Sequence, residues 1–562
     1  MRHCFWRTCP AAFSRGGART AVLTLTALLL AALPWTGGCK PDAPPPGAHA
    51  QVGGLEARGI SPDDLLKNAV QPLNHLEEFA SGEMLQHIVE RLNQWVETEE
   101  PLADWEVDPM VADLPQALRD LPQVKNLDKL EFPREDAFAL QEAVWLRDLS
   151  GWARGETLHE VEQARRLFDW TVRNIQLDAT PLGPDGRPLQ RVRQIPWEIL
   201  LFGRGTPMDR AQIFILLARE QGIDAAVLAL PDPKDPAGGR LRPWAVAVLS
   251  GGELYLFDAA LGLPIPAPGG IKLTADGQLD IQPATLGQLA GDESLLRRLD
   301  LDPQRPYPVK ASDLEGVVAL LAASPSALSM RMRLLEDHLA GPEKMALTTA
   351  PAPQAKRFLA VDHVGGARLW TLPFVTIYQR IELGRDPNFG RQQLAALMPF
   401  QVDPSRSLWK GRLRHLKGKL SGEEGATYYY QAARPSDAQL EAAVASKKLP
   451  DGAKALYARA KQDASYWLGL VSFELGNYPA AVDYFTKRTL AASPDGPWTH
   501  GAKYNLGRTC EAAGQHDQAM HQYEADLRSP GYHGNALRAR WLRSALAGRK
   551  VEGPKPSAEK GS

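Results

Sequence analysis

Cysteine is scarce in this chain, whose 562 residues include only Cys4, Cys9, Cys39 and Cys510. So low a number excludes both a disulfide-stapled fold and a cysteine-rich zinc site. An excess of charge is also lacking, because 64 Lys and Arg nearly cancel 66 Asp and Glu and leave a net charge of −2. We therefore expect no nucleic-acid partner. The apolar fraction of 44% is ordinary for globular proteins, and the length predicts roughly three to four domains.

The N-terminus of the chain carries a predicted export signal, residues 1–38. Four arginines precede an apolar run over residues 21–33, which is the arrangement of a signal peptide. These 13 residues are too few to cross a hydrocarbon core about 30 Å thick, so no permanent transmembrane helix is expected. The sequence Thr36-Gly37-Gly38-Cys39 follows and resembles the lipobox of bacterial lipoproteins, except that the lipobox prefers Leu where this chain has Thr36.

The resemblance to the lipobox implies that Cys39 is lipidated and becomes the mature N-terminus. The protein would then be an exported lipoprotein held in the cell envelope by its anchor, on the periplasmic side or at the outer membrane. The alternative is a plain secretory signal that ends near Cys39. Residues 39–60 are rich in Pro and Gly and predict an extended tether. Because Cys4 and Cys9 would leave with the signal, Cys510 is the one thiol expected to remain unmodified.

Hydrophobic periodicity divides the rest of the chain into regions. Residues 61–154 show helical spacing and predict a helical lead-in without chemistry of its own. Residues 155–270 combine helices with short apolar runs, which predicts an α+β unit. The runs expected to be buried strands are residues 225–230, 244–249 and 253–257. Residues 271–450 predict a mostly helical region of unknown type, and the whole chain is predicted to be a multidomain α+β protein.

A repeat with an offset of 38 residues occupies residues 451–550. The matched positions are Leu468 with Leu506, Gly469 with Gly507, Gly476 with Gly514, Ala481 with Ala519, and Phe485 with Tyr523. The pattern resembles the tetratricopeptide repeat, whose period of about 34 residues would be lengthened by an insertion. The resemblance implies an α-solenoid with a capping helix and a concave face that binds a protein or peptide. Cys510 is expected to be a buried, inert thiol on a repeat helix, and residues 551–562 a disordered tail.

Three stretches of the α+β unit carry a further resemblance. The first is residues 164–175, the second begins Gly205-Thr206-Pro207-Met208-Asp209 and runs on to residue 225, and the third joins Arg242-Pro243-Trp244 to a run that ends at Asp258. Together they resemble the transglutaminase-like superfamily. That resemblance implies a papain-type fold, in which a Cys at the start of a buried helix, a His on a strand and an Asp on the next strand form a triad.

The triad is degenerate in this sequence. Its chemistry needs a thiolate, a His base and an Asp that orients the His. The resemblance places Pro207 at the position of the nucleophile and Arg242 at that of the base, and neither side chain can do that work. Only Asp258 matches, and no His occurs between His159 and His338. We therefore do not expect catalysis by this triad.

The cleft left by the lost triad is a candidate ligand groove. Its predicted lining is Thr206, Asp209, Arg242, Trp244 and Asp258. Each position also has a purely structural interpretation, with Asp209 as a helix-start charge, Trp244 as a core residue and Asp258 as a cap at the end of a strand.

Other motifs add no chemistry. The sequence has no phosphate-binding loop, dinucleotide fingerprint or His-Glu-x-x-His, so no cofactor or metal is expected. His75 and His87 have no ligand-type partner nearby in sequence and are interpreted as structural or surface residues. The densest basic run, residues 409–419, is interpreted as a solvated face rather than a site for phosphate or lipid headgroups.

The sequence as a whole favours a non-catalytic, lipid-anchored envelope protein that acts as a scaffold for a protein or peptide partner. Two alternatives stay open at this point. One is an amidase or protease of transglutaminase-like fold with a non-standard site, and the other is a cell-wall-binding module.

Overall fold

The protein is described by a computed structural model that covers residues 61–78, 81–179, 192–232, 234, 240–450 and 452–548. The predicted signal, Cys39, the tether and the 551–562 tail lie outside the described residues. Within the described ranges, no helix has both the length and the apolar character needed to span a membrane.

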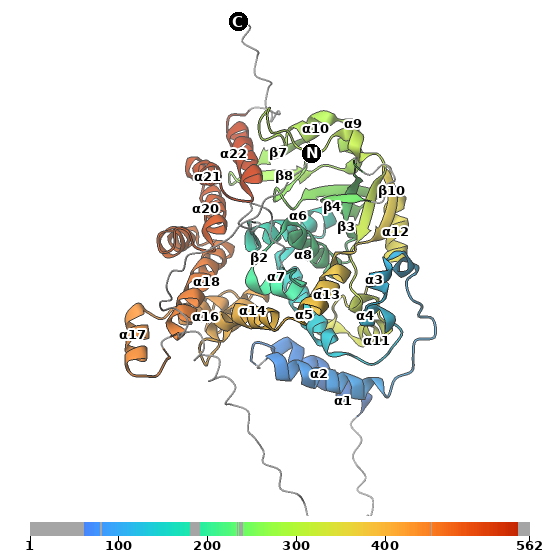
Figure 1. Cartoon of the computed structure of the whole chain (residues 1–562). Coiled ribbons are helices and arrows are strands. Elements are labelled where there is room, and N and C mark those ends of the chain that lie inside the picture. The colour runs from blue at the N-terminus through green and yellow to red at the C-terminus, as the bar shows by residue number, and fades with distance from the viewer. Residues whose placement is uncertain are drawn as a thin grey trace, which may run out of the picture.

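A mixed six-stranded sheet forms the centre of the fold, with the strand order β10-β9-β3-β4-β5-β6 (Figure 1). Its strands are β3 (Ala225–Pro231), β4 (Leu241–Ser250), β5 (Glu253–Asp258), β6 (Leu263–Pro264), β9 (Val317–Leu321) and β10 (Val364–Leu369). Neighbouring strands are antiparallel except β9 and β10, which are parallel. The strands expected at 225–230, 244–249 and 253–257 are thus confirmed as β3, β4 and β5. Gly251 and Gly252 have φ values of 59° and 81°, as the tight β4–β5 hairpin requires.

The sheet crosses the domain boundary expected at residue 270. β9 pairs with β3, and β10 extends the sheet on the far side of β9, so the region 271–450 supplies two strands to the central sheet. The ribbon of β7 (Pro266–Leu273) and β8 (Leu279–Pro283) also crosses residue 270. A single cluster of buried apolar side chains runs from Ala69 to Leu542. The expected separation at residue 270 is therefore corrected: one mixed α/β body with a continuous core spans it.

Helices pack on the sheet, and contacts with two other helices hold α8 in position on it. α8 (Pro207–Glu220) packs on β3 and β4 and contacts α5 (Arg134–Ala153) and α6 (Glu160–Asn174). The rings of Phe168 on α6, Phe214 on α8 and Phe257 on β5 have centroids 5.1 Å apart in each pair. This aromatic cluster holds two helices on one strand.

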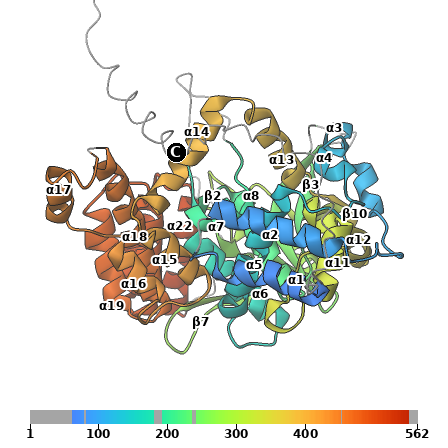
Figure 2. The ribbon, with the colours of Figure 1, turned by 90° about the horizontal axis from the view of Figure 1, so that it is seen from below.

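The N-terminal region is helical, as expected. Ser61 caps α1 through a 3.2 Å hydrogen bond from the N–H of Asp64, and α2 packs against α1 and α5. In Figure 2 these two helices lie across the near side of the body. The helices here are α1 (Pro62–Val70), α2 (Ser81–Val96), α3 (Gln116–Arg119) and α4 (Pro122–Lys125).

The remaining elements before the repeats are mostly short helices. They are β1 (Gln176–Leu177), α7 (Pro196–Phe202), β2 (Arg204–Gly205), α9 (Leu286–Gly291), α10 (Glu293–Arg297), α11 (Met330–His338), α12 (Pro351–Leu359), α13 (Leu372–Leu383), α14 (Pro387–Leu397), α15 (Ser407–Leu416), α16 (Ala426–Ala432) and α17 (Asp437–Ala445). α13 and α14 stand out from the body as an arch in Figure 2, and α14 contains no buried residue.

The C-terminal region is a stack of helical hairpins along one side of the sheet (Figure 1). Its helices are α18 (Ala453–Glu474), α19 (Tyr478–Asp483), a π-helical stretch (Tyr484–Leu490), α20 (Thr499–Ala512), α21 (His516–Glu524) and α22 (Tyr532–Leu546). The repeat in sequence is also a repeat of contacts. A Cβ atom added to Gly469 would lie 2.5 Å from Phe485, and one added to Gly507 would lie 2.5 Å from Tyr523.

The other matched positions of the repeat agree as well. Leu468, Leu506, Ala481, Ala519, Phe485 and Tyr523 are all buried. Gly476 and Gly514 have φ values of 70° and 72° and each ends the first helix of its hairpin. The offset of 38 residues therefore marks two hairpins built in the same way.

Candidate functional site

The first two residues of the predicted groove are engaged in starting a helix. The Thr206 hydroxyl accepts a 3.2 Å hydrogen bond from the N–H of Asp209, and the Asp209 carboxylate accepts a 2.7 Å bond from the N–H of Thr206. This reciprocal capping box begins α8, with Pro207 at the first helical position. The structural interpretation of Asp209 thus holds, and Pro207 occupies a place where its missing N–H costs nothing.

A second pair of groove residues is joined through a tyrosine that the sequence analysis did not single out. The indole Nε1 of Trp244 donates a 2.6 Å hydrogen bond to the hydroxyl of Tyr307, and that hydroxyl donates a 2.6 Å bond to Oδ2 of Asp258. Oδ1 of Asp258 accepts from the N–H groups of Ala260 and Leu261 at 2.8 and 2.9 Å. Each carboxylate oxygen of Asp258 therefore accepts at least one hydrogen bond from within the protein.

Burial controls the protonation of this chain of hydrogen bonds. Asp258 and Tyr307 are 4% and 5% exposed. Burial raises the pKa of the Asp258 carboxyl despite the hydrogen bonds that favour its charged form. Burial and the adjacent carboxylate raise the pKa of Tyr307 well above its usual value, while Arg242 opposes that rise. The tyrosine therefore stays a neutral hydrogen-bond donor at physiological pH.

The remaining predicted residue, Arg242, lies on an exposed part of β4. The start of α8 is tied to the end of β5 by Arg210, whose Nε and Nη2 donate to the carbonyls of Ile175 and Val172 and whose Nη1 lies 3.4 Å from the carbonyl of Ala259. The five predicted residues thus form two separate hydrogen-bonded groups and one exposed arginine, instead of one open lining.

His533 is a further residue that the sequence analysis missed. It lies on α22, and its charge interacts with that of Asp258, although its Nε2 is 2.7 Å from the carbonyl of Leu299. Burial lowers the pKa of His533. No local pattern could have revealed it, because α22 reaches the end of β5 through the docking of the whole C-terminal stack.

The repeat face built from α18 and α20 is covered by the protein's own chain. Asn505 on α20 donates to the carbonyl of Arg173 on α6 at 3.0 Å, and the side chain of Gln176 bridges the carbonyl of Pro497 and the N–H of Gly501. Arg173 also pairs with Glu474 of α18. This surface, which the sequence analysis expected to receive a partner, is occupied within the molecule.

Charged contacts strengthen the same interface. Arg508 pairs with Asp169 at 2.6 Å, and although burial opposes it, the charges of Arg508 and Arg173 hold the pKa of Asp169 well below its usual range. Glu511 pairs with Arg538 at 2.8 Å and also accepts the backbone N–H of Leu279 from β8. Cys510 is 2% exposed, and burial raises the pKa of its thiol, so the expected buried position is confirmed.

The basic run at 409–419 is mostly inside the protein, so its interpretation as a solvated face is wrong. Arg412 is fully buried, donates to the carbonyl of Leu200 at the end of α7 and lies over the ring of Trp467 at 4.9 Å. Lys417 donates to both carboxylate oxygens of Glu77 at 2.7 and 2.8 Å. Arg412 thus binds a carbonyl at the end of a helix, and Lys417 forms an internal ion pair. Counting charges along the sequence does not reveal such contacts.

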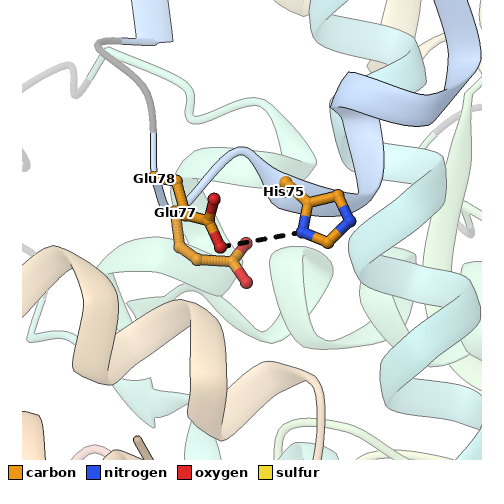
Figure 3. A group of neighbouring side chains, drawn as sticks. All are labelled: His75, Glu77 and Glu78. Carbon is orange, nitrogen blue, oxygen red and sulfur yellow. Dashed lines mark ion pairs between the residues drawn. The ribbon is translucent and has the colours of Figure 1, made fainter.

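One cluster has the composition of a metal site. His75, Glu77 and Glu78 bring one ligand atom each to within 4.8 Å of one another (Figure 3). The interpretation that His75 has no ligand-type partner nearby is therefore wrong. His75 faces Glu78 at 3.7 Å, whereas Glu77 is turned to Lys417. A cation would have to displace Lys417, so the donor set does not fit a metal site.

Comparison of the chain with known protein families, with curated proteins and with solved structures finds no match in any of the three.

Proposed function

We propose that this protein is a non-catalytic scaffold of the cell envelope, in which a degenerate transglutaminase-like core is joined to tetratricopeptide-like repeats. The observation that carries the proposal is the state of Asp258, whose two carboxylate oxygens are held by Tyr307 and by backbone N–H groups. An Asp that orients a catalytic His must accept a hydrogen bond from the imidazole. Within the described residues, Asp258 accepts from Tyr307 and the backbone, while His533 contacts the carbonyl of Leu299. With Pro207 and Arg242 at the other two positions, the site has a structural role.

The contacts around the repeats support a particular form of this scaffold. Because α18 and α20 are docked on α6 and β1, the core and the repeats form one unit, and a protein or peptide partner must use another surface. Exposed apolar side chains outside the docked face include Leu394, Leu475 and Leu527, which are 53%, 47% and 71% exposed. These side chains lie on three separate elements and not in one patch, so each is a separate position at which contact with a partner is tested.

The absence of catalysis is tested by measuring amine incorporation and amide hydrolysis with the purified full chain beside an active transglutaminase. We expect no turnover above that of heat-denatured protein. Asp258→Asn and His533→Gln are the informative variants, since these residues are the acid and the imidazole nearest to the degenerate site. Turnover that either substitution abolishes would show that the protein is an enzyme.

The scaffold role is tested by site-specific photo-crosslinking in cells that express the full chain. A crosslinking amino acid at position 394, 475 or 527 should give a discrete adduct with one protein. The same amino acid at Leu158, which is 86% exposed and precedes the N-terminal end of α6, far along the helix from the repeat contacts at Asp169 and Arg173, is the matched control. If none of the three test positions gave a discrete adduct, the proposal would be contradicted. It would also be contradicted if position 158 gave the same adduct in the same yield as the test positions.

A further inference from the structure

A cavity of about 380 Å³ lies between α5, α8, the start of α7 and the arch helix α13. This volume is within the range of about 300–1,000 Å³ that is usual for small-molecule sites. Most of its wall is apolar. Phe138 of α5 and Trp197 of α7 stack at 5.9 Å with 15° between their planes, and Leu216 and Ile377 face the same space.

The roof of the cavity is fixed by an ion pair. Arg380 of α13 donates to both carboxylate oxygens of Glu198 at 2.8 and 2.9 Å, so its charge is neutralised. Phe389 of α14 packs over the Arg380 guanidinium at 5.6 Å. The bidentate Arg380–Glu198 pair and the ring of Phe389 therefore hold α13 in place over the cavity and set its shape.

Arg219 of α8 brings a positive charge to the wall. Its guanidinium donates to the carbonyl of Ala322, and within the described part of the chain it forms no ion pair. The acidic groups nearest to it are engaged elsewhere: Asp224 pairs with Arg357, and Glu220 accepts from the N–H of Ala346. Burial lowers the pKa of Arg219, and the charges of Glu220, Glu142 and other acids offset that effect only in part. A carboxylate bound within ion-pair distance would stabilise the guanidinium further.

Glu142 of α5 also faces the cavity and accepts a 3.2 Å hydrogen bond from the N–H of Trp197. Burial raises the pKa of its carboxyl to about 8, so near neutral pH it is mostly protonated and can donate a hydrogen bond. The other acid on the wall, Glu135, is exposed two turns away on the same helix, or about 10 Å. The interior of the cavity is therefore positive at Arg219.

We propose that this cavity binds a small monocarboxylate with an apolar body, whose carboxylate lies between Arg219 and Glu142. The body would lie against Phe138, Trp197 and Ile377. Two kinds of molecule share this chemistry, an aliphatic acid and the C-terminal carboxylate of a short apolar peptide. The site goes beyond the proposed scaffold function and does not depend on it.

The test is calorimetric titration of the purified full chain with sodium decanoate, 1-decanol, decylamine and acetyl-leucyl-phenylalanine, each below its aggregation limit. A carboxylate should bind saturably with one site per chain and more tightly than the alcohol or the amine. Arg219→Gln should weaken the carboxylate by about 10- to 100-fold, because a charge-assisted hydrogen bond is lost, and should leave decanol within about twofold. Arg219→Lys should retain part of the affinity.

Arg166→Gln is the matched control, because it removes an exposed arginine that pairs with Glu162 on its own helix and lines no part of the cavity, so all affinities should stay unchanged. Thermal unfolding without ligand shows that each variant is folded. If the binding of both carboxylates depends on Arg219, the one that binds with the higher affinity identifies the kind of ligand. Failure of both carboxylates to bind, or equal binding of decanoate and decanol that Arg219→Gln does not alter, would overturn the proposal.

Discussion

Arg508 of the second repeat hairpin and Asp169 of α6 are 339 residues apart in the chain, yet the Nη1 atom of the first lies 2.6 Å from Oδ1 of the second. Asp169 also receives Arg173 from its own helix at 2.8 Å. The carboxylate therefore lies between two guanidinium groups, one from each side of the interface. This arrangement links the stability of the core to the docking of the repeats.

Arg508→Gln should lower the free energy of unfolding by about 1–3 kcal/mol, below the usual cost of breaking a fully buried pair because the Asp169 side chain is 39% exposed. Urea unfolding followed by tryptophan fluorescence measures the change. The matched control is Arg166→Gln, whose partner Glu162 is on the same helix at the surface, and its effect should stay below about 0.5 kcal/mol. Equal effects of the two substitutions would mean that the interface pair adds nothing.

Tyr307→Phe removes the hydroxyl that joins Trp244 to Asp258 and should cost about 1–3 kcal/mol, because a buried carboxylate oxygen loses its donor. The loss should be larger at pH 8 than at pH 5. Burial already raises the pKa of Asp258, and acid protonates that carboxyl further, so the donor matters less there. The control is Tyr255→Phe on β5. Measuring the stability of both variants against pH separates this effect from the loss of any tyrosine hydroxyl.

Local patterns predicted several parts of the fold correctly. The apolar runs of β3, β4 and β5, the Gly251-Gly252 turn and the helix-start role of Asp209 all depend on residues close together in sequence. The repeat spacing also matched positions that make the same contacts, because Gly469 and Gly507 lie at equal distances along the chain from the aromatic residues that they contact.

Long-range contacts could not be predicted in the same way. β10 contains Gly365 and Gly366 and has no strand signal; a side chain at 365 would lie 2.8 Å from Gly316, so the strand depends on its approach to the loop before β9. Tyr307 is likewise an unremarked residue in a loop until the fold places it against Asp258. The prediction of one open groove was wrong for that reason, because Tyr307, from a distant segment, lies between Trp244 and Asp258.

Gly507→Ala tests the repeat packing, because the new methyl group would lie 2.5 Å from the ring of Tyr523. We expect a loss of about 1–3 kcal/mol from overpacking, and partial recovery when Tyr523→Leu is added. Gly151→Ala on α5 is the control. No atom lies within 4 Å of its added methyl group, so helix propensity should stabilise the protein by about 0.5–1 kcal/mol. A neutral Gly507→Ala would contradict the close packing of α20 on α21.

Glu142→Gln should stabilise the protein increasingly as the pH rises from 5 to 8. Burial raises the pKa of Glu142 from 4.5 to about 8, so in this window the folded state binds a proton that the unfolded chain has released. The unfolding free energy of the parent then falls with pH by up to about 1.4 kcal/mol per unit from this group, whereas glutamine does not titrate. The difference between variant and parent should therefore be small at pH 5 and reach about 1–3 kcal/mol at pH 8, as measured by urea unfolding at each pH. Saturating decanoate, if it binds beside the carboxyl as proposed, should shift both curves upward. A difference that stays constant from pH 5 to pH 8 would mean that Glu142 ionises as readily in the cavity as in the unfolded chain, and it would remove the protonated carboxyl from the description of the site.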